Sequence, residues 1–113
     1  MCLSNNKVDR EELGTWDSRS NFSYEGSVEK GTVIYYGSNR KVKFAAEEYI
    51  KLIKHFKGRT VAIGTSRTSP PKDSLGSWIK AYTAKPAIAS YIGPILINEG
   101  FAKKVGRSEI RFY

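Results

Sequence analysis

Hydrophobic side chains recur at helical spacing in three stretches of the chain from residue 44 onward. Across residues 44–57 they return every three or four positions, so they line one face of a helix. Glutamates lie in the first turns of this segment, lysines in its last turn and Gly58 just beyond it, and this order opposes the helix dipole. The predicted apolar stripe consists of Ala45, Tyr49, Ile50, Ile53 and Phe56.

Two further helices are expected after a loop rich in serine, threonine and proline, over residues 74–82 and 86–99. Pro86 suits the first position of the later helix, because the amide that proline lacks would have no partner there. Pro94 follows Gly93 inside that helix and removes one hydrogen bond, so we expect a kink or two shorter pieces. The predicted core positions are Leu75, Trp78, Ile79 and Tyr82 in the first helix, and Ile88, Ile92, Ile95 and Leu96 in the second.

Three segments have the composition or the alternation of strands. Residues 31–37 and 59–64 are short runs rich in β-branched side chains and bounded by glycine or charged residues. Residues 109–113 alternate between charged and apolar side chains, as a half-buried strand does. A turn at residues 106–108 would join this strand to the segment before it as a hairpin. The apolar face of that hairpin is predicted to carry Val105, Ile110 and Phe112.

The first part of the chain lacks such periodicity. Residues 1–31 are polar, mixed in charge and interrupted by glycines, with Trp16, Phe22 and Tyr24 as the large apolar anchors. We therefore expect a partly ordered polar arm over residues 1–31, followed by a single α+β domain over residues 32–113.

Composition bounds the class of protein. With 113 residues, 40% of them hydrophobic and 27% charged, the chain has the character of one globular domain. No apolar run approaches the ~18 residues of a membrane span, and no secretory signal is seen, so a cytoplasmic location is expected. The single cysteine, Cys2, cannot form an internal disulfide and has no histidine or cysteine beside it to bind a metal.

The net charge of the chain bears on the kind of ligand that it binds. The formal net charge is +8, and 15 of the 19 lysine and arginine side chains lie in residues 38–113. A surplus of this size attracts phosphate chains at long range, which favours a nucleic-acid ligand. A surface of lysines that serves only solubility is the alternative.

The order of parts over residues 74–113 is helix, short turn, helix, glycine and basic hairpin, and it resembles the winged helix-turn-helix family of DNA-binding domains. The resemblance depends on Leu75, Trp78 and Ile79 in the first helix, on Ile88, Ile92 and Leu96 in the second, and on Gly100-Phe101 before the hairpin. It implies an α+β fold in which a winged-helix-like C-terminal half follows a strand-helix-strand extension.

The resemblance also implies a way of binding. The helix over residues 86–99 would enter the major groove, while the hairpin, or wing, would lie along the backbone. Ser90 and Tyr91 lie on the exposed side of this helix, where neither makes the bidentate base contacts of Arg, Asn or Gln. Binding would thus depend on phosphate contacts and DNA shape. The implied phosphate contacts of the wing are Lys103, Lys104, Arg107 and Arg111.

Other basic positions are candidates from their own surroundings. The segment Arg40-Lys41-Val42-Lys43 is flanked by aromatic residues, and stacking on bases or sugars needs aromatics beside cations. The alternation of Val42 and Phe44 with Lys41 and Lys43 suits a half-exposed strand without a ligand, which is the default interpretation. Arg67 lies in a loop of hydroxyl side chains that could hold a phosphate, although an ordinary surface loop is the simpler reading. Lys85 would join the same basic face.

Catalysis has little support in the sequence. His55 is the sole histidine and has no acidic neighbour in the sequence to orient it as a base. Glu47 and Glu48 are adjacent on a helix and so point about 100° apart, which suits dipole or salt-bridge roles better than one metal site. We expect no catalytic residue, no metal and no cofactor. A nuclease site from carboxylates distant in the sequence stays open.

These observations predict a non-catalytic DNA-binding protein in a regulatory or accessory role. A protein-interaction or oligomerisation module, such as a homodimer or the partner of an acidic protein, is the leading alternative. An RNA-binding protein shares the same electrostatics and is the next.

Overall fold

The computed structural model describes residues 10–66, 70–83 and 88–113. In chain order the elements are β1 (Glu11–Gly14), β2 (Asn21–Ser27), β3 (Gly31–Tyr36), β4 (Arg40–Phe44), α1 (Ala46–Phe56), β5 (Thr60–Ala62), α2 (Leu75–Tyr82), α3 (Ala89–Asn98), β6 (Ala102–Val105) and β7 (Glu109–Phe112). The expected α+β class is confirmed. Within these residues, no helix is long and apolar enough to cross a membrane.

The first four strands form one antiparallel sheet, sheet A, in the order β1-β2-β3-β4. Successive side chains of a strand point to opposite faces, so Phe22 and Tyr24 of β2 lie in the core while Ser23 and Glu25 lie on the outer face. The turn into β3 requires glycine at position 26, which has a φ of +91° and lies against the Gly31 carbonyl.

Sheet A corrects the division expected from the sequence. Residues 10–31 form β1, β2 and their turns, in place of a partly ordered arm, and residues 1–9 lie outside the described part. Trp16, Phe22, Tyr24 and Val28 from this region are all buried. The strands are short and carry few inward side chains, so their two-residue alternation is hidden among polar residues.

Helix α1 matches the expected position but presents a different face. Phe44 belongs to β4, and the residues of α1 that are buried are Tyr49, Leu52 and Phe56. Ile50, which was predicted to lie in the core, is 56% exposed. The Tyr49 hydroxyl lies 2.8 Å from the Thr32 hydroxyl, and this hydrogen bond ties the helix to β3 inside the core.

The second sheet, sheet B, has the order β5-β7-β6. It contains the predicted hairpin, in which Ile110 and Phe112 face inward as expected. The predicted core positions of the last helix are confirmed, since Ile88, Ile92, Ile95 and Leu96 are all at most 1% exposed. In α2 the stripe ends one turn earlier than predicted, because Tyr82 is 71% exposed.

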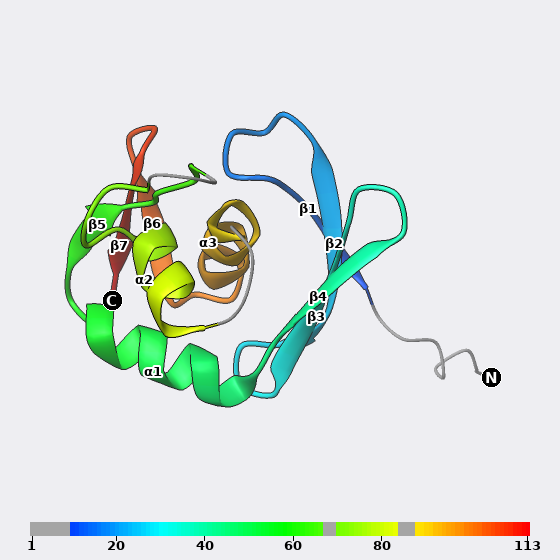
Figure 1. The fold of residues 1–113 in the computed structure, drawn as a ribbon, viewed down its shortest axis with the longest axis horizontal. Helices are drawn as coiled ribbons and strands as arrows, with labels where there is room; N and C mark the ends of the chain where they lie inside the picture. The colour runs from blue at the N-terminus through cyan, green and yellow to red at the C-terminus, as the bar shows by residue number, and fades with distance from the viewer. Residues whose placement is uncertain (1–9, 67–69, 84–87) are drawn as a thin grey trace.

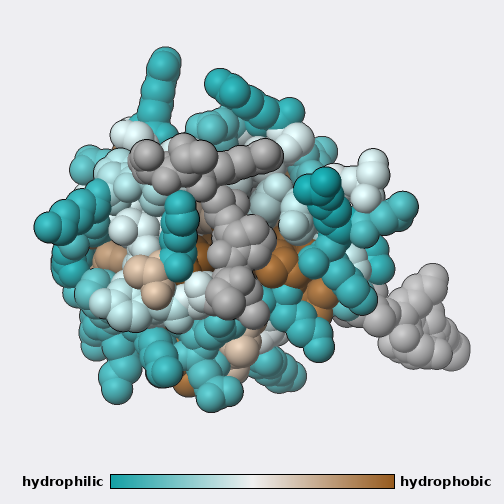
Figure 2. All heavy atoms as spheres, viewed as in Figure 1, coloured by the Kyte–Doolittle hydropathy of each residue, from teal (hydrophilic) through white to brown (hydrophobic). Residues whose placement is uncertain are grey.

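Helix α3 lies in the middle of the molecule (Figure 1). Sheet A lies on one side of it, and α2 and sheet B lie on the other, while α1 runs below. Figure 2, in the same view as Figure 1, shows hydrophilic side chains over most of the surface. Hydrophobic patches appear mainly between sheet A and the part formed by α2 and sheet B. The arrangement leaves the outer faces of the two sheets as the broad polar surfaces available to a ligand.

Candidate nucleic-acid interface

Two cations lie side by side on the outer face of sheet B. Lys103 of β6 is directly opposite Arg111 of β7, and Arg111 is opposite Thr60 of β5, so all three side chains share the solvent face. Both cations are exposed, and neither has a hydrogen bond or ion pair in the part of the chain that the structure describes. Like charges directly opposite each other destabilise a strand pair, so this pairing is unfavourable for folding.

An aromatic side chain extends this surface. The Tyr113 amide donates to the Phe101 carbonyl at 3.2 Å, which continues the strand pairing beyond β7. Residues two apart in a strand point the same way, so Tyr113 follows Arg111 on the solvent face, where its side chain is 61% exposed. We call the surface made by Thr60, Lys103, Arg111 and Tyr113 the outer wing face.

The other two predicted wing cations have different surroundings. Lys104 is opposite Ile110 on the core-facing side of the hairpin but remains exposed, and its ammonium donates to the Trp16 carbonyl at 2.9 Å and lies 4.7 Å from the centre of the Trp16 ring. Arg107 is exposed at the turn, and its carbonyl accepts the Trp16 indole N–H at 2.7 Å. Val105 is opposite Glu109 on the solvent face, which corrects its predicted inward place.

Helix α3 is engaged by sheet A on the side where base contacts were expected. The Ser90 carbonyl accepts the Trp16 amide at 3.0 Å. The Tyr91 ring packs between Phe22 and Tyr36, with ring centres 5.1 and 5.0 Å away. Both Ser90 and Tyr91 are therefore contacts within the protein, and insertion of α3 into a major groove would require sheet A to move.

The Gly93-Pro94 pair explains how Trp16 reaches the helix. Pro94 has no amide hydrogen, so the Ser90 carbonyl one turn before it lacks its helical partner and accepts the Trp16 amide instead. A side chain at Gly93 would place its Cβ 2.9 Å from the Trp16 ring, so glycine leaves room for the indole. The helix continues through both residues as one element and is not divided into two shorter pieces, and the pair forms a docking place for Trp16.

The C-terminal end of α3 is tied to sheet A as well. The Glu99 carboxylate accepts from the Tyr24 hydroxyl at 2.7 Å and from the Val28 amide at 2.8 Å. The Asn98 amide donates to Glu11 at 2.9 Å. Burial and the hydrogen bond to Glu99 raise the pKa of Tyr24 above its usual value. Both ends of α3 thus form hydrogen bonds with residues of sheet A and of its connecting turns.

The basic residues of β4 lie on two faces of sheet A. Lys41 and Lys43 share the outer face, and Lys41 is directly opposite Tyr35. Arg40 is opposite Tyr36 on the other face and is exposed. The sequence placed aromatic residues beside these cations, and the register gives Lys41 an aromatic neighbour in Tyr35. Phe44, in contrast, is fully buried.

Arg67 and Lys85 lie outside the described residues. Among the residues that the structure does describe, no three histidine, cysteine, aspartate or glutamate side chains come together as a metal site. His55 is exposed at the end of α1, with its ring 4.6 Å from that of Phe56. The carboxylates of Glu25 and Glu99 accept hydrogen bonds from the protein itself.

None of the protein-family models matches this chain, and neither the curated proteins nor the solved structures show a significant similarity to it. Only the chemistry of its own residues therefore points to a function.

Proposed function

We propose that this protein binds duplex DNA without catalysis, in a regulatory or accessory role, by contacts between the outer wing face and DNA phosphates. The observation that carries the proposal is the direct pairing of Lys103 with Arg111. Like charges opposite each other are unfavourable for folding, and neither cation forms an ion pair among the described residues, although Glu109 shares this face two residues before Arg111. A polyanion outside the chain would supply the counter-charge.

The arrangement of elements gives further support. Two helices followed by a basic hairpin are the order typical of winged-helix domains, and β5 pairs with that hairpin to complete sheet B. Because sheet A covers α3, the proposed contacts come from the wing and not from a recognition helix. Lys and Arg contacts to phosphates carry no sequence information, so we expect binding to depend weakly on base sequence.

Replacing Lys103 and Arg111 together by glutamine tests this proposal. Each cation that neutralises a phosphate contributes ~0.9 to the slope of log affinity against log salt, so the double variant should flatten the slope by about 1.8 at most. The fall in affinity should be the same for duplexes of different sequence. Fluorescence anisotropy of labelled duplexes over a range of salt concentrations measures both quantities.

A matched control comes from α1, where Lys51 and Lys54 are also exposed cations. The variant with glutamine at both positions has the same net charge as the wing variant, and we expect it to keep the wild-type salt slope more closely. Equal losses in the two variants would assign binding to overall charge alone. Absence of salt-sensitive duplex binding by the wild type at micromolar concentration would refute the proposal.

A further inference from the structure

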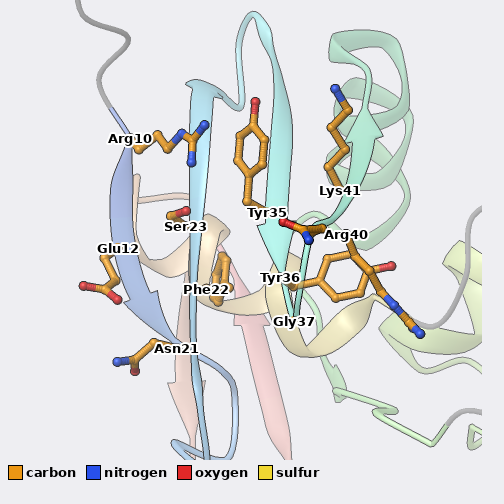
Figure 3. A pocket seen from close by; sticks show the side chains of 11 residues that line it. Arg10, Glu12, Asn21, Phe22, Ser23, Tyr35, Tyr36, Gly37, Arg40 and Lys41 are labelled. Atoms are coloured by element: carbon orange, nitrogen blue, oxygen red, sulfur yellow. The ribbon is translucent and has the colours of Figure 1, made fainter.

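A hollow of about 600 Å³ is lined by residues of sheet A, away from the outer wing face. Arg10, Ser23, Tyr35 and Lys41 line it from the outer face of the sheet, whereas Phe22, Tyr36 and Arg40 line it from the other face. Its floor and walls come from all four strands of the sheet and from the turn between β3 and β4 (Figure 3). The lining residues of polar or charged character include Arg10, Glu12, Asn21, Ser23, Asn39 and Lys41. The hollow is therefore open to solvent and rich in groups that form hydrogen bonds.

The Arg10 guanidinium lies over the Tyr35 ring beside this hollow. The Arg10 guanidinium lies 3.9 Å from the centre of the Tyr35 ring, and its Nε donates to Glu25 at 3.0 Å. The Tyr35 hydroxyl donates to the other oxygen of the same carboxylate, also at 3.0 Å. These three contacts hold the ring and the guanidinium in place, while the Arg10 side chain stays 52% exposed. Aromatic rings and guanidinium planes are the surfaces on which unpaired bases stack.

Charge is distributed unevenly around the pair. At the β1 edge of the sheet, Arg10 is paired with Glu25 and Glu12 has no cationic partner among the described residues, whereas Lys41 lies at the β4 edge. Arg40 is also in β4, but its side chain is on the other face of the sheet. In Figure 3, Arg10 and Lys41 lie on opposite sides of Tyr35. Neither Arg40 nor Lys41 has a side-chain partner among the described residues. A phosphate is thus favoured along β4 and disfavoured along β1.

We propose that this hollow binds one nucleotide of a single-stranded nucleic acid, with its base stacked on the Tyr35–Arg10 pair and its phosphate next to Lys41. Asn21 and Ser23 lie within the same hollow and offer hydrogen bonds to the base edge. A duplex does not fit this mode, because its base faces are covered by neighbouring bases. The site is separate from the outer wing face and does not depend on the duplex proposal.

The test measures anisotropy of a labelled oligothymidylate of about eight nucleotides, a length within the range bound by single-strand binding folds. Tyr35→Leu should weaken binding about 5- to 150-fold, the loss that corresponds to one stacked base. Tyr35→Phe keeps the ring and should bind like the wild type. The control Tyr82→Leu removes a tyrosine that is 71% exposed on α2, and it should also bind like the wild type.

Lys41→Gln tests the phosphate contact without touching the ring. It should lower the salt slope for the oligothymidylate by ~0.7, the value for one phosphate of a single strand. A melting curve of each variant shows whether folding is intact. Because Lys41 is exposed, Lys41→Gln should stay folded. It therefore tests the single-strand site even if Tyr35→Leu unfolds.

Three results would overturn the single-strand site. They are wild-type affinity in both Tyr35→Leu and Lys41→Gln, equal displacement of the oligothymidylate by an acidic peptide, and no oligothymidylate binding by the wild type. The two proposals fail separately, because the variant of Lys103 and Arg111 should keep oligothymidylate binding through the hollow while Tyr35→Leu should keep duplex binding.

Discussion

Replacing Trp16 by alanine is expected to lower the free energy of unfolding by about 3 to 5 kcal/mol, the range for a large buried aromatic. The Trp16 side chain is 3% exposed, and the residue, which follows β1, contacts both α3 and the hairpin of β6 and β7. Its amide binds Ser90, its indole N–H binds Arg107, and its carbonyl accepts Lys104. Truncation removes the ring and the indole hydrogen bond, so it opens a cavity between α3 and the wing.

Urea unfolding followed by circular dichroism measures this loss. Trp16→Phe is the graded control, because it keeps most of the aromatic volume and loses the hydrogen bond to the Arg107 carbonyl. We expect it to cost less than alanine does, with about 1 kcal/mol of its loss due to that bond. A loss below about 1 kcal/mol for Trp16→Ala, as for ordinary surface residues, would mean that Trp16 does not hold the hairpin of β6 and β7 against α3.

Replacing Gly93 by alanine is expected to destabilise the protein by about 1 to 3 kcal/mol, the usual cost of overpacking a core. Alanine normally stabilises a helix relative to glycine by about 1 kcal/mol, so the expected sign is reversed here. The reason is steric, because the new Cβ would lie 2.8 Å from Ile63 Cδ1 and 2.9 Å from Trp16 Cε3.

A double-mutant cycle shows whether Trp16 is the cause. In a Trp16→Ala background the ring is absent, so Gly93→Ala should cost clearly less, with a coupling of at least ~0.5 kcal/mol between the two sites. Gly14→Ala is the matched control, because Gly14 has only two backbone neighbours, at 4.0 Å from the added Cβ. Additive losses at positions 16 and 93 would contradict the docking of Trp16 on Gly93.

The C-terminal half could be predicted because its signals are local. Helix α3 has four apolar core residues at helical spacing, and the hairpin has a turn followed by clear alternation. The composition of residues 31–37 indicated β3, whereas β1 and β2 were missed because their stability depends on pairing between strands and on burial of Trp16, Phe22 and Tyr24 against α3. Pairing of this kind depends on residues distant in the sequence, so no short window contains it.

The candidate site, like the fold, could be predicted from the sequence only in part. Lys103 and Arg111 were identified from the sequence, but their direct opposition follows from the register of β6 and β7. The register also turns Lys104 inward and Val105 outward, the reverse of a prediction that grouped side chains by hydrophobicity. The hollow beside Tyr35 needed the pairing of all four strands of sheet A, and the only sequence signal for it was a tyrosine near a basic turn.

An amide chemical-shift map of the protein with a short DNA duplex tests the central claim most directly. If the outer wing face holds the phosphates, the largest shifts should lie in β6 and β7, around Lys103 and Arg111, and should disappear as salt is added. The amide signals of α3 should keep the chemical shifts of the free protein, because sheet A covers that helix. Shifts centred on Ser90 and Tyr91, with sheet A displaced, would contradict the account and favour a recognition helix.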